Sequence, residues 1–309
     1  MKKILGLPLN LENFLLEYNM SLYDFYQNTG ARSLFRLKKW AGIIEDDRDV
    51  DDKIYSMMTG FFHVNSARLL DYWIRYIDGN KVANNEEERI MRNMLYYTFY
   101  KKNPAKCGFQ SIDEGIESVL KETFVRDEVL QILKYNRKHI SFVAGRNEYS
   151  YLCPLDLHCR YNTNQIMAAF GLFTETESPE FREGVKRFED KKTDIFFINL
   201  NKSEKDFSPS TMYEDYAIND KLFHWQSQSQ DRQASAKIQR YINHKNTGDI
   251  ISLFVREFKR LGSYTAPYTF LGNADYVKHE GERPVSFVWK LHNSIPADML
   301  PKANKSIAL

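Results

Sequence analysis

Cysteine is scarce in this sequence of 309 residues, and its three cysteines form no familiar pattern. Cys107, Cys153 and Cys159 are odd in number, and neither they nor the neighbouring His158 have the spacing of a zinc site. Disulfide frameworks belong to oxidising compartments, so this content favours a reduced, cytoplasmic protein. No apolar run approaches the ~20 residues of a membrane span, and polar residues follow the start too soon for a signal-peptide core. We therefore expect no contact with a membrane.

Net charge is also small. The chain has 43 Lys and Arg against 41 Asp and Glu, a formal charge of +2. This balance excludes a global attraction to nucleic acid, so any such surface must be a local patch. One basic cluster lies on and beside a helix expected at residues 33–40. Its members are Arg32, Arg36, Lys38 and Lys39. Acidic residues follow at once, so both a phosphate-binding surface and a solvated helix face remain open.

Strong catalytic signatures are missing as well. The sequence has no P-loop, no dinucleotide-binding fingerprint, no HExxH and no GxSxG. We therefore expect no catalytic residue, no cofactor and no metal in this chain. One weaker arrangement points the other way. An apolar strand is flanked by Asp249, Glu257 and Lys259, with Glu214 and Asp215 upstream, as in Mg²⁺-dependent nucleases. The alternative is that these residues form salt bridges at the end of a strand.

The hydrophobic periodicity changes near Gly145. Before it, apolar residues recur at helical spacing, for example over residues 66–77 and 127–139. After it, alternating and fully apolar runs predict strands at residues 155–161, 195–200, 222–229, 250–255 and 285–291, with 250–255 as a central strand. Residues 174–192 predict an amphipathic turn or two, and 267–277 a strand, a turn and a strand. The sequence thus predicts an α+β protein with a helical domain (1–145) and a β-rich domain (146–309).

Residues 207–229 combine aromatic rings, amides and carboxylates in a short span. Aromatic rings shape a pocket and amides recognise a ligand through hydrogen bonds, so this stretch suits the wall of a polar pocket. The alternative is a buried polar network that fixes the loop geometry. Together with side chains further along, it offers stacking faces, amides and a cation for holding a single-stranded or extruded base. The candidate DNA-binding residues are Tyr213, Asp215, Trp225, Gln226, Gln228, His244, Arg256 and Tyr268. The alternatives for Trp225 and Arg256 are a core ring and a structural ion pair.

Several longer motifs together resemble a known bacterial domain. They are FSPSTMYEDYAI (207–218), LFHWQSQS (222–229), QRYI (239–242), LFVRE (253–257), PYTFLG (267–272) and VSFVWKL (285–291). This pattern resembles an uncharacterised domain that usually follows the motor lobes of superfamily-two DEAD/DEAH-type helicases, often with a phospholipase-D-like nuclease domain at the front. LDLHCRY (155–161) and the helical first half look like the post-helicase region of the same family.

The resemblance implies a restriction or anti-phage defence factor, with a β-rich part similar to PUA- and SRA-like readers of modified bases. The chain has no Walker A lysine, no DEAD/DEAH box and no nuclease motif pair, so ATPase and nuclease activity do not carry over. It is then a fragment, or a stand-alone relative that works with a motor in trans. We expect a non-catalytic DNA-recognition module, binding duplex DNA or a flipped base, with helicase and nuclease domains as partners in cis or in trans. A scaffold that regulates the motor lobes and a Mg²⁺-dependent nuclease are the alternatives.

Overall fold

The first half of the chain is a set of helices, most of which begin at a side chain that caps them. Ser21, Ser33, Ser66 and Ser111 each accept a hydrogen bond from the backbone N–H three residues on, as does Asn85. The computed structural model describes residues 3–4, 7–46, 52–181, 184–201 and 215–304. After a short hairpin of β1 (Lys3–Ile4) and β2 (Leu7–Pro8), the helices are α1 (Leu11–Glu17), α2 (Leu22–Asn28), α3 (Leu34–Trp40), α4 (Asp52–Met58), α5 (Ala67–Ile77), α6 (Glu86–Phe99), α7 (Pro104–Cys107), α8 (Ile112–Leu120) and α9 (Thr123–Lys138).

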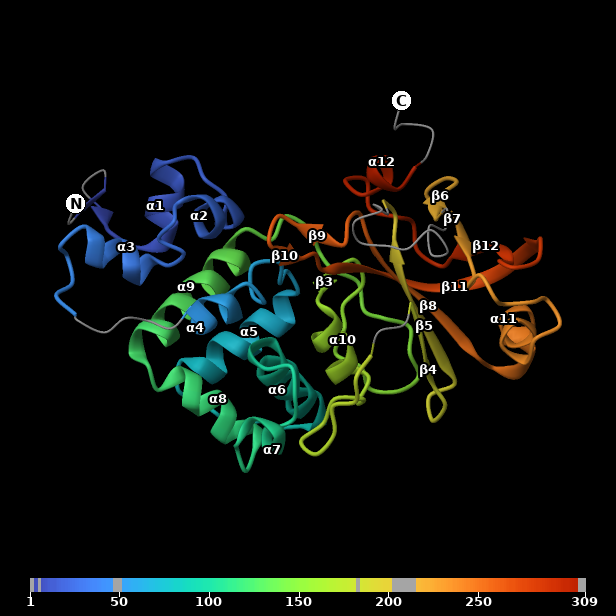
Figure 1. Cartoon of the computed structure of the whole chain (residues 1–309), viewed down its shortest axis with the longest axis horizontal. Coiled ribbons are helices and arrows are strands. Elements are labelled where there is room, and N and C mark those ends of the chain that lie inside the picture. The colour runs from blue at the N-terminus through green and yellow to red at the C-terminus, as the bar shows by residue number, and fades with distance from the viewer. Residues whose placement is uncertain (1–2, 5–6, 47–51, 182–183, 202–214, 305–309) are drawn as a thin grey trace.

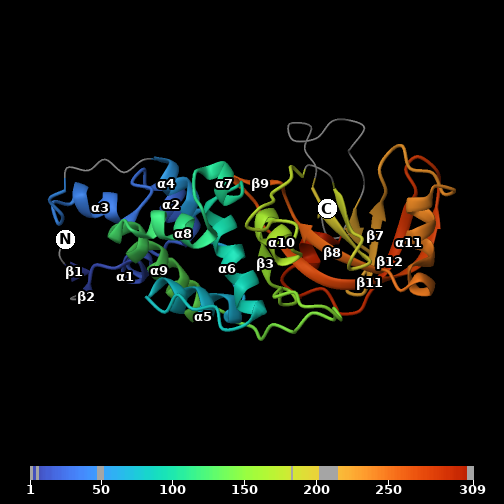
Figure 2. The same cartoon turned by 90° about the horizontal axis from the view of Figure 1, so that it is seen from below.

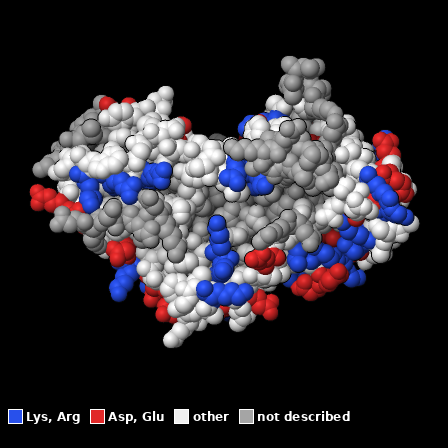
Figure 3. All heavy atoms as spheres, in the orientation of Figure 1, with Lys and Arg blue, Asp and Glu red and all other residues white. Residues whose placement is uncertain are grey.

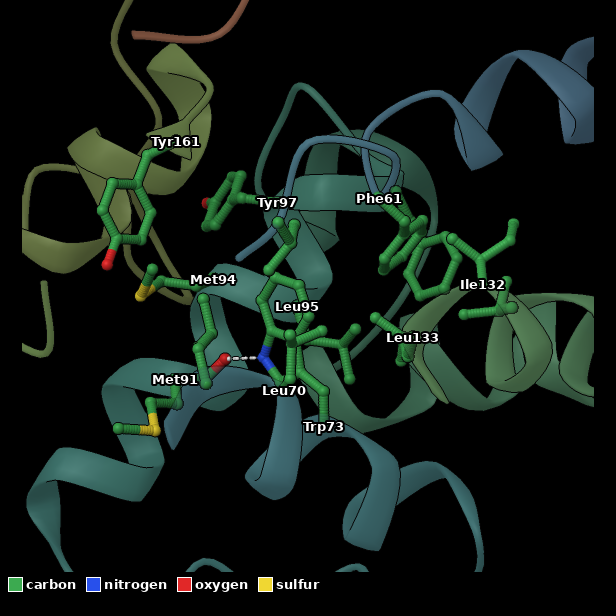
Figure 4. Packing of buried hydrophobic residues seen from close by; sticks show 14 of the residues in the cluster. Phe61, Leu70, Trp73, Met91, Met94, Leu95, Tyr97, Ile132, Leu133 and Tyr161 are labelled. Atoms are coloured by element: carbon green, nitrogen blue, oxygen red, sulfur yellow. Dashed lines mark hydrogen bonds between the residues drawn. The ribbon is translucent and has the colours of Figure 1, made fainter. Parts of the chain in front are cut away.

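Large side chains fill the space between these helices (Figure 4). Trp73 of α5 is fully buried, and its indole N–H donates to the carbonyl of Met91 on α6 at 2.8 Å. At Gly115 on α8, a Cβ would lie 2.5 Å from the ring of Tyr96, so α8 approaches α6 closely only because that position has no side chain. The helical half is therefore held by ring packing across helices that the capping residues define. None of the helices in the described ranges is long and apolar enough to cross a membrane.

The second half is built on a mixed sheet. Its strands lie in the order β4-β5-β8-β11-β12-β7-β6, with β3 paired to β11; β5 and β8 are parallel and the other neighbours are antiparallel. The elements are β3 (Arg160–Tyr161), α10 (Thr163–Ala169), β4 (Val185–Phe188), β5 (Thr193–Asn199), β6 (Tyr216–Ala217), β7 (Leu222–Gln226), α11 (Ala236–Thr247), β8 (Ile250–Arg256), β9 (Arg260–Leu261), β10 (Tyr264–Thr265), β11 (Tyr268–Glu280), β12 (Ser286–Leu291) and α12 (Leu300–Ala303). The predicted α+β class and the central position of β8 are confirmed.

Two local predictions are wrong. Residues 267–277 form no strand, turn and strand but one long strand, β11. Its register shifts around Gly272, at φ +89°, and again after Tyr276, so extra residues are absorbed as bulges and the strand continues. Within residues 174–192, Val185 to Phe188 pair with β5 as an edge strand, because backbone pairing overrides the helical spacing of three apolar side chains. Of residues 155–161, only Arg160 and Tyr161 form a strand.

Each face of the sheet packs against a different partner. Successive residues of β5 alternate: Ile195 and Phe197 belong to the cluster that continues into the helical half, whereas Phe196 and Ile198 belong to a second cluster with α11. We call these the inner face and the outer face. Figures 1 and 2 show α10 between the helices and the sheet, and α11 beyond the sheet. The last N-terminal helix ends at Lys138, close to the predicted boundary, yet one hydrophobic cluster joins both halves.

Candidate functional site

The structure does not bring the eight predicted DNA-binding residues together. Trp225 of β7 lies on the outer face, 6% exposed, with its ring stacked on Phe196 at 4.2 Å between centroids. Arg256 and Tyr268 lie on the other side of the sheet, where the guanidinium carbon is 4.2 Å from the centre of the Tyr268 ring. Since the sheet separates Trp225 from Arg256, they cannot line one pocket.

The other described members of the predicted set hold loops and strands in place. Asp215 accepts a hydrogen bond from the backbone N–H of Gln226 at 3.0 Å, and the Gln226 amide donates to Ser286. The Gln228 amide oxygen accepts from Lys237 at 2.9 Å. Tyr213 lies outside the described residues. These contacts form a polar network, which the sequence left open as the alternative, but only Asp215 in it is buried and Gln228 is exposed.

His244 of α11 is buried and bonded at both ring nitrogens. Its Nε2 accepts from the backbone N–H of Tyr276 at 3.0 Å, so Nδ1 carries the proton and donates to the Asp249 carbonyl at 3.2 Å. Burial lowers the pKa of His244, which favours this neutral form. His244 therefore ties α11 to β8 and β11.

The predicted nuclease residues are also separated. Asp249 precedes β8 and Glu257 follows it, so the seven residues of the strand lie between them, roughly 25 Å at ~3.3 Å per residue. Asp249 instead pairs with Arg187 at 2.7 Å. One ion cannot be shared by Asp249 and Glu257. More widely, the described part of the chain holds no group of three or more His, Cys, Asp or Glu side chains placed to bind a metal.

A different feature has the character of a binding site. A cleft of about 610 Å³ lies between the helical half, the start of α10 and the β9–β10 hairpin. We call it the polar cleft. It is lined by Tyr26, Gln27, Arg32, Tyr55, Ser56, Met57, Thr59, Gly60, His63, Thr98, Phe99, Lys101, Asn162, Thr163, Asn164, Ser263, Tyr264 and Thr265. Hydroxyl and amide groups dominate this lining, and none of the described residues in it is a carboxylate.

The β9–β10 hairpin reaches the helical half at the turn between its strands. Gly262 has φ +59°, and a Cβ there would lie 2.6 Å from the Gln27 side chain, so only glycine permits this approach. The Gln27 amide donates to the Leu261 carbonyl at 3.2 Å. The ring of Tyr264 makes edge contacts with the rings of Tyr23 and Phe62, at 5.4 and 5.7 Å between centroids. The hairpin therefore forms one wall of the polar cleft, held against α2.

Two cations lie on different walls of the polar cleft. Arg32 comes from the turn before α3 and Lys101 from the segment after α6; both are exposed. Burial and the neighbouring Tyr23 raise the pKa of the Tyr264 phenol to about 12, although the charge of Arg32 opposes that rise. Figure 3 shows Lys and Arg gathered over α3 and near the β9–β10 hairpin, on the face seen in Figure 1. The described lining of this cleft therefore carries two positive charges, although the net charge of the chain is close to zero.

His63 lines the polar cleft in a fixed tautomer. The Gln165 amide nitrogen donates to the Gly60 carbonyl at 3.2 Å and to the Thr98 hydroxyl at 3.0 Å, so its oxygen faces His63 Nε2 at 3.0 Å and accepts. His63 then carries its proton on Nε2 and offers Nδ1 as an acceptor. Burial lowers its pKa to about 4, so the ring is neutral at pH 7.

A buried carboxylate supports the cleft from behind. Glu128 of α9 is 2% exposed and accepts from the Tyr26 hydroxyl at 2.6 Å and from the backbone N–H of Leu34 at 2.7 Å. A third hydrogen bond comes from the backbone of Phe35. Burial nevertheless raises the pKa of Glu128 to about 7. Glu128 thus joins α9 to the start of α3, two residues after Arg32.

Of these residues, the sequence analysis singled out only Arg32, as part of the basic cluster. His63, Lys101 and Tyr264 carry no local motif, since two come from short connections and one from the short strand β10, far apart along the chain. The residues NTNQ (162–165) were visible in sequence only as a helix cap, which they form. A site made of single side chains from remote loops leaves no spacing signal.

Comparison with known proteins identifies part of the chain. Residues 155–302 match the family model described as a domain of unknown function (DUF3427). The match is compatible with the resemblance drawn from the motifs, most of which lie inside it, and that description names no helicase. The matched region contains the sheet and the cleft residues of α10 and the β9–β10 hairpin, whereas Arg32, His63 and Lys101 lie outside it. No curated protein matches the chain.

Proposed function

We propose that the polar cleft binds DNA and that this chain is a non-catalytic DNA-recognition module of a helicase-type restriction or anti-phage defence factor. The observation that carries the proposal is the charge of the cleft. Arg32 and Lys101 come from different connections of the helical half, and among the residues that the structure describes no carboxylate lines the cleft. A DNA backbone brings closely spaced negative charges, which such a lining attracts through Coulomb interaction and counterion release.

The remaining lining residues suit the same ligand. Hydroxyl and amide groups position phosphates and sugars without reading sequence, and Ser56, Thr59, Asn162 and Asn164 provide them here. The basic side chains of α3 extend the positive surface beyond the cleft (Figure 3). With a formal charge of only +2 on the whole chain, this local gathering is what a nucleic-acid surface requires.

The partners in this proposal come from the resemblance to helicase-associated domains. A motor and a nuclease domain, in cis or in trans, would supply the ATPase and cleavage chemistry, in the cytoplasm. The chain would then hold the DNA on which they act. This part of the proposal is supported by the motifs within residues 207–291.

Fluorescence anisotropy with labelled duplex and single-stranded DNA at 50 to 200 mM NaCl tests DNA binding. Each lost phosphate contact should lower the slope of log K against log[salt] by about 0.7 for a single strand or 0.9 for a duplex. We expect that decrease for Arg32→Ala and for Lys101→Ala, and twice as much for the double variant.

Lys278→Ala is the matched control. Lys278 is exposed near the far end of β11, roughly 30 Å along the strand from Tyr268, and its removal should leave the slope unchanged. Absence of binding to both DNA forms at 50 mM NaCl would reject the proposed function. If the double variant binds DNA with the same slope of log K against log[salt] as the parent, DNA is held outside the polar cleft.

A further inference from the structure

We infer that the polar cleft takes a single strand of DNA in preference to duplex DNA. This inference rests on the proposed function and names the form of DNA that the cleft selects. Three features of the lining carry it: the concave shape, the setting of Tyr264 and the acceptor nitrogen of His63.

The first feature is concavity. Proteins read a duplex mainly with elements that protrude into its grooves, such as a helix or a two-stranded ribbon. Here two cations line a cleft of about 610 Å³, within the ~300–1,000 Å³ range of pockets that enclose small ligands. A cleft of that size encloses one or two nucleotide units, and it is too small to enclose the cross-section of a duplex. Positively charged grooves with aromatic side chains are the usual way to hold a single strand.

The second feature is the position of Tyr264. Its ring is half-buried and is fixed by edge-type contacts, at interplanar angles of 83° to Tyr23 and 75° to Phe62. No other described ring lies stacked on it. Arg32 lines the same cleft. A base stacked on Tyr264 would thus place the attached phosphate within the reach of a cation, and only an unpaired strand offers a base face to a side chain.

The third feature is the fixed tautomer of His63. Because Gln165 accepts the Nε2 proton, Nδ1 remains as the acceptor nitrogen of a ring that lines the cleft. Exocyclic amino groups of adenine, cytosine and guanine are the donors that nucleobases provide. In a duplex the pairing edge of each base is engaged by its partner, whereas in a single strand that edge is open to His63.

The experiment compares a labelled 15-mer single strand of mixed sequence with its duplex at 100 mM NaCl. We expect the single strand to bind at least tenfold more tightly. Tyr264→Leu keeps apolar bulk against Tyr23 and Phe62 but removes the aromatic face, and should weaken single-strand binding by about 5- to 150-fold, the range for one lost base stack. Tyr264→Phe is the matched control, because it keeps the ring and should stay within twofold of the parent. Thermal unfolding checks that both variants are folded.

Three outcomes overturn the inference. Duplex binding as tight as single-strand binding, or tighter, removes the preference while leaving DNA recognition in place. Single-strand affinity within twofold of the parent in folded Tyr264→Leu removes the stacking role. Failure of both DNA forms to bind overturns the proposed function as well. A failure of the single-strand preference alone is therefore distinguishable from a failure of DNA binding.

Discussion

The substitution Trp225→Ala tests whether Trp225 binds DNA or packs in the core. The sequence placed Trp225 in a DNA pocket, whereas the structure places it in the outer-face core. Its ring stacks on Phe196 at 4.2 Å between centroids and meets the rings of Tyr241 and Phe287 at 6.0 and 5.8 Å. A truncation here removes a large ring from a cluster that joins β7, β5, α11 and β12.

The expected loss of stability is large. Truncating a buried Trp or Phe to Ala typically costs ~3–5 kcal/mol, since the apolar transfer energy is lost and a cavity remains. Trp225 is only 6% exposed, and three aromatic neighbours lose a ring contact, so a value in that range is expected. Urea denaturation followed by far-UV circular dichroism measures it. Trp40→Ala is the control, because Trp40 of α3 is 64% exposed and such surface changes usually stay within ~0.5 kcal/mol.

DNA binding gives the second readout. The variant, tested in its folded range, should bind DNA as the parent does, since Trp225 lies away from the polar cleft. A stability loss below about 1 kcal/mol would contradict the core role, because a buried Trp in contact with three rings cannot be removed so easily. A loss of DNA binding with stability intact would restore the pocket that the sequence suggested.

Two further predictions concern buried carboxylates. Burial raises the pKa of Glu128 to about 7 from 4.5. Between these two pH values the folded state keeps a proton that the unfolded state has lost. The free energy of unfolding should therefore fall as the pH rises from 4.5 to 7, by at most about 3 kcal/mol. Urea denaturation at pH 5 and pH 8 should show that decrease in the parent and a smaller one in Glu128→Gln, and equal decreases would refute the assignment. Asp194 is fully buried and accepts from Arg187 at 3.1 Å and twice from Arg240 at 2.9 Å. Asp194→Ala removes these bonds while Arg187 keeps Asp249, so it should cost ~1.5–3 kcal/mol, the usual range for hydrogen bonds to charged groups. The exposed Asp190→Ala is its control in the same assay, and a similar small loss for both would show that the Arg187–Asp194–Arg240 contacts contribute little.

Local chemistry determined much of the secondary structure. Ser21, Ser66 and Ser111 define helix starts because a short hydroxyl side chain satisfies a backbone N–H that the helix leaves open. Residues 250–255 are apolar on both faces, and that pattern by itself places β8 inside the sheet. The small net charge likewise restricts any nucleic-acid surface to a local patch.

Tertiary structure decided which residues meet. Trp225 and Arg256 belong to the same sheet, yet alternation and strand order place them on opposite faces. The hydrophobic pattern of one β-strand does not determine which helices cover each face of the sheet. The polar cleft joins Arg32, Lys101 and Tyr264, which are far apart in sequence. Sequence patterns report interactions between neighbours along the chain, whereas the positions of remote loops follow from how the helices and the sheet pack together.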